Sequence, residues 1–295
     1  MTLKYLEPRR EEAKGSGRST IINIQAPVTQ SRCKVFFHIA TLGNYQGIVT
    51  EILESLKSSG LFKKIEKLCV GIVGTGHVAG LDDERIIILS RHPDLNRMEF
   101  ETLKHVQRMA VEDPDCLILY LHTKGCSAPA AKSAVQADWR RYMLHFLVKR
   151  HEECFTALAD HDVCGVDWRI EPCRHFSGNF WWARGNYLAT LPSIAELSKP
   201  SAPFVITHRH NAEFWIGMNP DVNPHCLFDC GISVYERYQF RLHPVFYYRR
   251  RGRIGWLAQR FLTFDRAARE WSRDLHQEAN RLRVKLANKI ARIRN

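Results

Sequence analysis

The fold of this chain is constrained most by a series of apolar runs that do not alternate with polar residues. Five such runs lie at 34–40, 68–73, 85–90, 116–121 and 163–166. Between them, segments 45–58 and 100–110 place apolar side chains three or four residues apart, as on one face of a helix. Unalternating strands separated by amphipathic helices are typical of a mostly parallel sheet covered by helices on both faces. We therefore predict an α/β fold of the nucleotide-binding, Rossmann type, whose ligands bind beyond the carboxyl ends of the strands.

The positive charge of the chain is concentrated at its C-terminus. Residues 249–295 carry 14 Lys or Arg and 4 Asp or Glu, so +10 of the net +12 belongs to them. From Leu257 to Ile293, apolar residues recur every three or four positions, which predicts a long amphipathic helix. We expect a polar lead-in at 1–30, a domain at 31–248 and a basic amphipathic tail at 249–295. The tail (255–295) either contacts a membrane surface, associates with a second copy or covers its own domain.

Features that the sequence lacks predict the cellular compartment of the protein and the class of its partners. It has no apolar run of 18 residues and no signal-peptide h-region. Its nine cysteines, an odd number, form no small-domain framework and are expected to be reduced. These features predict a cytoplasmic protein, with peripheral membrane contact as the alternative. Nucleic acid is not expected as a partner, because the body carries little excess charge and no nucleic-acid module.

Cationic side chains follow the strand at 116–121. His122 and Lys124 precede Gly125, and lysine, histidine and a glycine turn at a strand's carboxyl end suit a phosphate group. Arg140, in a helix expected to open at Asp138, is a further candidate for a diphosphate. The alternative is a solvated loop with an incidental lysine.

The segment 175–184 is rich in aromatic and small polar residues. Its candidates for a sugar or acceptor pocket are Ser177, Gly178, Asn179, Trp181 and Trp182. Aromatic rings stack on the C–H faces of sugars, while Asn and Ser bond the hydroxyls. The alternative is a buried strand with large core side chains.

A single carboxylate, Glu213, lies in the apolar, helix-like stretch 209–217. Burial would raise its pKa and make it a better general base, whereas pairing with Arg209 would make it an ordinary surface glutamate. His208, His210, Cys226 and Cys230 are a weaker zinc candidate, because neither spacing matches a usual finger pattern.

Taken together, several segments resemble a family of glycosyltransferases of large DNA viruses and bacterial polysaccharide gene clusters. The matching segments are 43–45, 59–62, 99–103, 119–125, Trp139-Arg140, 175–183 and 212–217. The resemblance implies a GT-A-like fold with one nucleotide-sugar site. Typical members of that class end the corresponding strand with Asp-X-Asp, which holds a divalent metal on the diphosphate, whereas this chain has His122 and Lys124 there.

Roles for individual residues follow from the same resemblance. Cationic side chains are expected to replace the metal, with Asp167 as the fallback ligand if Mn²⁺ or Mg²⁺ is used. Glu213 takes the position of an inverting general base, with Asp229 as the second choice. The expected enzyme transfers a sugar from a UDP- or GDP-sugar to a glycan hydroxyl, in the host cytoplasm if it is viral. The alternative is a non-catalytic, glycan-binding or membrane-associated scaffold.

Overall fold

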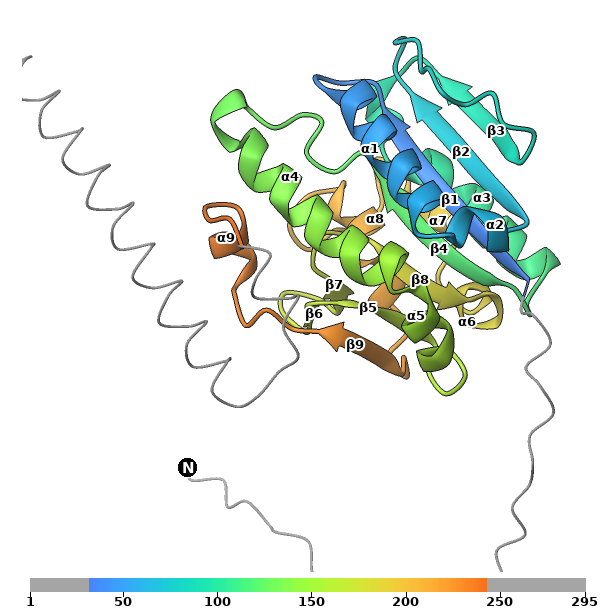
Figure 1. The fold of residues 1–295 in the computed structure, drawn as a ribbon. Helices are drawn as coiled ribbons and strands as arrows, with labels where there is room; N and C mark the ends of the chain where they lie inside the picture. Colours follow the sequence, from blue (N-terminus) through green and yellow to red (C-terminus); the bar gives the residue numbers. More distant parts are fainter. Residues whose placement is uncertain (1–31, 243–295) are drawn as a thin grey trace, which may run out of the picture. The chain divides into compact units, whose positions relative to one another are not determined.

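A seven-stranded sheet runs through the middle of the computed structural model, which describes residues 32–242 (Figure 1). Its strands are β1 (Cys33–Ala40), β2 (Lys67–Val73), β3 (Ile86–His92), β4 (Leu117–His122), β5 (Val163–Val166), β8 (Trp181–Arg184) and β9 (Pro224–Phe228). They are ordered β3-β2-β1-β4-β8-β5-β9. Only β8 runs antiparallel to its neighbours, so the predicted mostly parallel α/β sheet is confirmed.

A short two-stranded sheet, β6 (Trp168–Arg169) with β7 (His175–Phe176), accompanies the main one. The helices are α1 (Tyr45–Ser58), α2 (Leu61–Lys64), α3 (Phe100–Glu112), α4 (Ala130–Leu144), α5 (His151–Ala157), α6 (Gly185–Ala189), α7 (Ile194–Leu197), α8 (His210–Phe214) and α9 (Val234–Arg237). Three shorter turns are η1 (Leu95–Arg97), the π turn η2 (His145–Lys149) and η3 (Trp215–Gly217).

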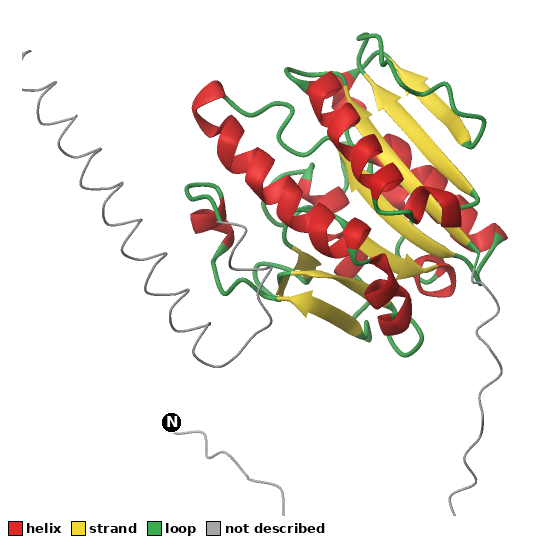
Figure 2. Cartoon of the chain, viewed as in Figure 1, coloured by secondary structure: helices red, strands yellow, loops and turns green. Residues whose placement is uncertain are grey.

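Helices cover both faces of the sheet, as continuous apolar strands require (Figure 2). One core cluster joins the sheet to α1, α2, α4, η2 and α5. A second cluster joins the opposite face to α3, α6, α7, α8 and η3. The central strand β1 is buried from Cys33 to Ile39, because it is paired on both edges and covered on both faces.

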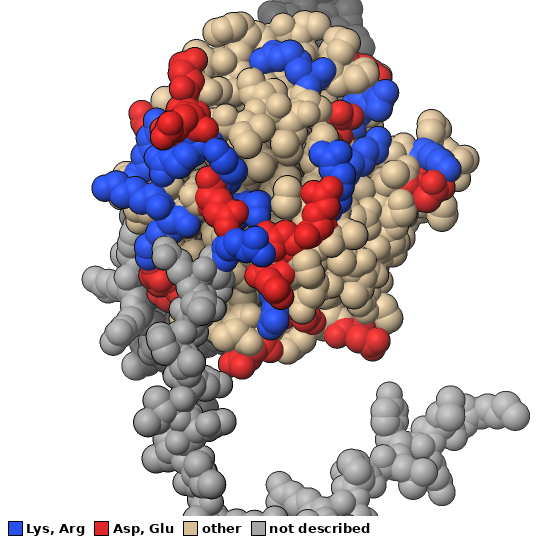
Figure 3. All heavy atoms as spheres, turned by 90° about the vertical axis from the view of Figure 1, so that its right-hand side faces the viewer, with Lys and Arg blue, Asp and Glu red and all other residues tan. Residues whose placement is uncertain are grey.

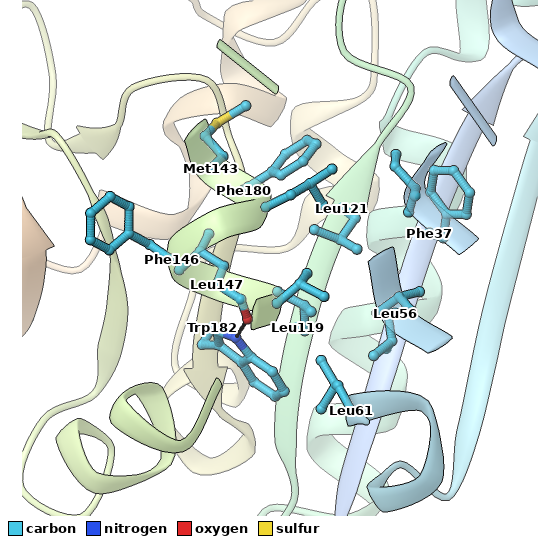
Figure 4. Packing of buried hydrophobic residues seen from close by; sticks show 14 of the residues in the cluster. Phe37, Leu56, Leu61, Leu119, Leu121, Met143, Phe146, Leu147, Phe180 and Trp182 are labelled. Atoms are coloured by element: carbon cyan, nitrogen blue, oxygen red, sulfur yellow. Dashed lines mark hydrogen bonds between the residues drawn. The ribbon is translucent and has the colours of Figure 1, made fainter. Parts of the chain in front are cut away.

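The two adjacent tryptophans of β8 belong to opposite faces of the sheet. Trp181 lies in the cluster with α3, and Trp182 lies in the cluster with α4 and η2. Both are fully buried. The indole Nε1 of Trp182 donates to the Leu147 carbonyl at 2.8 Å, beside Leu119 of β4 (Figure 4). Because successive side chains of a strand point to opposite faces of the sheet, each ring is buried in the core cluster on its own face.

The element boundaries agree with the sequence in the first half and differ after β4. Helix α1 spans Tyr45–Ser58 as predicted. Helix α4, on the same face, begins at Ala130 instead of at Asp138, which lies in its interior. The Asp138 carboxylate faces the segment after α9, where its Oδ2 accepts a hydrogen bond from the Leu242 main-chain N–H at 2.6 Å. Asp138 therefore serves a tertiary contact and does not begin the helix, contrary to the prediction from the sequence.

Charges of both signs are interspersed on the surface of the described domain. Figure 3 shows one face, on which Lys and Arg alternate with Asp and Glu around a broad uncharged area. This agrees with a body that carries little net charge. Within residues 32–242, no helix has the length and apolar character needed to cross a bilayer. The lead-in and the basic tail predicted from the sequence lie outside the described residues.

Candidate functional site

A cavity of about 450 Å³ lies beyond the carboxyl ends of β1 and β4. The strand order runs β3-β2-β1 in one direction and continues with β4 on the other side of β1. This reversal is the place where α/β sheets of this kind bind their ligands. The charged and imidazole side chains that line the cavity are His38, Glu99, His122, Lys124, Lys132 and Arg209. Its size and position fit a small-molecule site with an anionic ligand.

Lys124 is a nearly buried cation without a carboxylate partner in the part of the chain that the structure describes. It is 6% exposed, and its Nζ lies 4.1 Å from the centre of the Trp139 ring and 5.4 Å from that of Tyr238. Among residues 32–242, Nζ has neither a hydrogen bond nor an ion pair. The rings hold the ammonium group by cation–π attraction and leave its three N–H donors to the cavity.

The turn after β4 is fixed by a glycine and by Arg140. Gly125 has φ +85°, and a Cβ there would lie 2.6 Å from the Cβ of Gln136, so other residues would strain the turn. The Arg140 Nη1 donates to the Lys124 carbonyl at 2.7 Å, and its Nε donates to Glu51 at 2.8 Å. Arg140 does not line the cavity. Its guanidinium positions the Lys124 turn, and its expected contact with a diphosphate stays a prediction.

Glu99, just before α3, is the one carboxylate among the described lining residues. Its Oε2 accepts hydrogen bonds from Asn179 Nδ2 at 2.6 Å and from the Tyr120 hydroxyl at 3.3 Å. Arg209 Nη2 lies 3.8 Å from Oε1. Burial alone would raise the pKa of Glu99, but His122, Arg209, His38 and the Asn179 hydrogen bond together lower it to about 2. The carboxylate is therefore ionised at neutral pH.

Two histidines beside Glu99 are neutral at pH 7. Burial lowers the pKa of His38 to about 4, although Glu99 acts in the opposite direction. Burial likewise lowers the pKa of His122. The Nε2 of His122 lies 3.1 Å from the Gly178 carbonyl, which can only accept, so Nε2 carries the proton. That donor is already used, and His122 does not serve the phosphate-donating role expected from the sequence.

The predicted sugar pocket, residues 177–182, lies behind the cavity instead of lining it. Ser177, Gly178 and Asn179 are buried; the Gly178 carbonyl contacts the His122 ring, Asn179 contacts the Glu99 carboxylate, and the main-chain N–H of Ser177 donates to the Asp167 carbonyl. Gly178 adopts φ +96°, and a Cβ there would lie 2.6 Å from Met143 Sδ. Asn179, with φ +58°, bonds Glu99 through Nδ2 and accepts from Trp181 Nε1 at 2.9 Å. The segment therefore positions the two lining side chains, and its tryptophans form core instead of a stacking wall.

Asp167 and Asp229 form a second polar cluster with Cys230. In the described range, these three are the group whose ligand atoms lie within 4.8 Å of one another. The Arg169 guanidinium already lies between the carboxylates, 3.6 Å from Asp167 and 3.1 Å from Asp229. Burial raises the pKa of the Cys230 thiol, so a thiolate is disfavoured. The cluster fits an arginine-bridged structural pair better than a divalent metal, and neither aspartate lines the cavity.

Glu213 lies on α8, one helical turn after Arg209, and is partly exposed. It does not line the cavity. Burial lowers the pKa of the neighbouring His175, while the Cys173 carbonyl and the Glu213 carboxylate act in the opposite direction. The zinc candidate His208, His210, Cys226 and Cys230 is not brought together as one cluster within the described part of the chain.

Sequence reasoning missed three lining residues. Glu99, His38 and Arg209 were not singled out as site residues, yet they surround one end of the cavity. The available signal was topological: His38 lies near the carboxyl end of a strand, and Glu99 lies in the connection that follows another. Arg209 carried no comparable signal, because it lies just before α8 and is far from these strands in sequence.

Three solved structures show a distant similarity to this chain. Rv0371c from Mycobacterium tuberculosis H37Rv is 11% identical, with 71% of this chain and 96% of that chain covered and a TM-score of 0.38. A 4-diphosphocytidyl-2C-methyl-D-erythritol synthase is 12% identical, with coverages of 74% and 95% and a TM-score of 0.34. The corresponding synthase from Anaerococcus prevotii DSM 20548 is 9% identical, with coverages of 68% and 89% and a TM-score of 0.34. Similarity at this level does not indicate a shared substrate.

Sequence comparison gives a family but no characterised relative. No curated protein matches the chain. Residues 39–237 match the model of a domain of unknown function, DUF8361. This range includes β4, the Lys124 turn and every charged or imidazole side chain of the cavity except His38. Because the match covers well over half of the 295 residues, the chain belongs to the DUF8361 family.

Proposed function

We propose that this protein is a glycosyltransferase that moves a sugar from a nucleotide-sugar donor to a glycan hydroxyl. The observation that carries the proposal is the Lys124 ammonium group, which is nearly buried in the cavity and unpaired among the described residues. A buried cation of this kind requires an anion. The sheet reversal beside it favours a nucleotide, whose diphosphate would supply that anion.

The chemistry of transfer can be assigned to residues of this chain. The acceptor oxygen bonds to the anomeric carbon of the donor sugar as the bond from that carbon to the diphosphate breaks. The bonding electrons leave with the diphosphate, and Lys124, with Arg209 nearby, stabilises its growing negative charge. These cations would replace the divalent metal of typical GT-A enzymes. Mn²⁺ or Mg²⁺ would need oxygen ligands, and Glu99 is the single carboxylate that the described lining offers.

The acceptor proton is assigned to Glu213. This glutamate lies four residues after Arg209, on the same side of α8 as that lining residue. Asp229 is not retained as the second choice, because both of its carboxylate oxygens face the Arg169 guanidinium, at 3.1 and 3.2 Å.

Changing Glu213 to Gln is expected to lower kcat for sugar transfer by about 100-fold or more, because general-base catalysis contributes roughly that factor. The Kd of the donor is expected to stay within about twofold, since the variant keeps the shape of the side chain. Steady-state kinetics and calorimetry measure the two quantities. Glu196→Gln, on an exposed side chain of α7, is the matched control. Turnover at the wild-type rate would remove Glu213 from the mechanism.

A thermal-stability screen of the full chain tests the function as a whole. UDP, GDP and their sugars are compared, each with Mn²⁺ and with a chelator. A ligand at about 100 times its Kd adds roughly 2.7 kcal/mol to the free energy of unfolding, which raises Tm measurably. We expect one nucleotide series to stabilise the protein in the presence of chelator. A response that requires Mn²⁺ would contradict metal replacement by Lys124, and no response to any nucleotide would favour the glycan-binding scaffold.

A further inference from the structure

Two hydrogen-bond acceptors lie close together in the cavity, and neither receives a hydrogen bond from the described residues 32–242. They are Glu99 Oε1 and His122 Nδ1, which lie 3.9 Å apart. Both side chains are more than nine-tenths buried, and both line the cavity. Facing acceptors repel each other unless a donor lies between or beside them.

The partners of the Glu99 carboxylate are unevenly divided between its oxygens. Oε2 accepts from Asn179 and Tyr120, whereas Oε1 accepts no hydrogen bond from any residue in 32–242. The nearest cation, Arg209 Nη2, is 3.8 Å from Oε1, beyond hydrogen-bond distance. Oε1 is therefore an ionised oxygen that is held in place by its neighbours and open to a ligand donor.

The tautomer of His122 makes its second nitrogen an acceptor as well. Nε2–H is directed at the Gly178 carbonyl, so Nδ1 of the neutral ring carries a lone pair. Gly178 and Asn179 are consecutive residues, so one short turn orients both acceptors. Binding side chains are held in place by supporting residues, so two acceptors oriented by the same turn are expected where a ligand contacts both.

We propose that Glu99 Oε1 and His122 Nδ1 bind a vicinal diol of the ligand, with one hydroxyl donating to each acceptor. The inference rests on the proposed function and defines what the cavity recognises beside the diphosphate. The diol belongs either to the ribose of the nucleotide or to the transferred sugar, and both present the same chemistry. The Lys124 ammonium, in the same cavity, would hold the phosphate attached to either group.

Glu99→Gln is a sharp variant because it converts the open acceptor into a donor. Asn179 and Tyr120 both donate, so the glutamine amide oxygen takes the place of Oε2. Its NH₂ group then takes the place of Oε1, 3.9 Å from His122 Nδ1, so that a donor stands where the ligand hydroxyl would donate. The variant is expected to fold with a lower Tm, because the folded protein stabilises the charged form of Glu99, and to lose the diol site. Glu112→Gln, on an exposed glutamate at the end of α3, is the matched control.

Binding of three ligand types to the wild type and both variants tests the proposal by calorimetry. The probes are UDP and GDP, their 2′-deoxy forms, and UDP-glucose and GDP-mannose. If the diol is the ribose, the wild type binds the ribonucleotide at least about tenfold more tightly than its 2′-deoxy form, and Glu99→Gln abolishes that ratio. If the diol is the sugar, the 2′-deoxy form binds equally well, the nucleotide sugar binds about tenfold more tightly than the nucleotide, and Glu99→Gln removes that gain.

The outcomes separate this inference from the function on which it rests. In one outcome, the protein binds nucleotides, but the ratio of Kd values between the 2′-deoxy form and the ribonucleotide, and that between the nucleotide and the nucleotide sugar, is the same in wild type and Glu99→Gln. That result overturns the diol site and leaves the proposed transferase function intact. Wild type that binds none of these probes overturns the proposed function and the diol site together. Equal losses in Glu99→Gln and Glu112→Gln would show a general charge effect, which also overturns the diol site.

Discussion

Replacing Lys124 with methionine is expected to weaken the binding of a nucleoside diphosphate by roughly 10- to 150-fold. Charge-assisted hydrogen bonds contribute about 1.5–3 kcal/mol, and their loss corresponds to that change in Kd. Methionine keeps an apolar stem against the Trp139 ring, where the lysine now lies 4.1 Å from the ring centre, so the turn should retain its packing. Isothermal calorimetry with the nucleotide identified by thermal stability measures the Kd.

The control for Lys124→Met must remove one positive charge without touching the cavity. Lys63→Met does so, because Lys63 is exposed on α2. We expect its Kd to stay within twofold of the wild-type value at physiological ionic strength, since surface charges are screened over about 8 Å. If the two variants bind the nucleotide equally well, Lys124 is not the diphosphate ligand and the proposed function loses the observation that carries it.

Most of the fold is predictable because its strands are buried on both faces. Strand β1 is covered on both faces, and the run 34–40 is mainly apolar at the sequence level, with Lys34 and His38 as its polar residues. The same logic located β2, β4 and β5 to within about one residue. The start of α4 was misplaced because a buried Asp that serves a distant main-chain N–H looks like a helix-starting residue.

The site was only partly predictable, for a different physical reason. Lys124 could be found because it follows a strand directly and therefore lies at the ligand-binding edge. The contacts of Arg140 could not be predicted, since its partner Glu51 is 89 residues away in sequence. Arg209 reaches Glu99 only through the packing of α8 beside α3. Such pairs depend on tertiary contacts that no local pattern encodes.

Trp181 and Trp182 show how the correct rule of side-chain alternation led to a wrong prediction, that of a wall for stacking sugars. Alternation prevents Trp181 and Trp182 from sharing a face, so a strand with one solvent-facing side would leave one ring free to stack on a sugar. In a sheet covered by helices on both faces, however, each face of the strand is an interior. Both rings are consequently core, and the observation that favoured a glycan-binding wall is removed.

Trp182→Ala is therefore expected to lower the free energy of unfolding by about 3–5 kcal/mol, the cost of truncating a fully buried aromatic side chain. The loss includes the hydrogen bond from Nε1 to the Leu147 carbonyl, which would be left unpaired in the core. Urea denaturation followed by circular dichroism measures the change, with Trp182→Phe expected to lie between wild type and alanine. Phe204→Ala, at a 54% exposed aromatic residue, should change stability by less than about 0.5 kcal/mol.

A stacking wall for sugars makes the opposite prediction: Trp182→Ala would keep wild-type stability and lose glycan binding. That result would restore the scaffold interpretation and contradict the core role of β8.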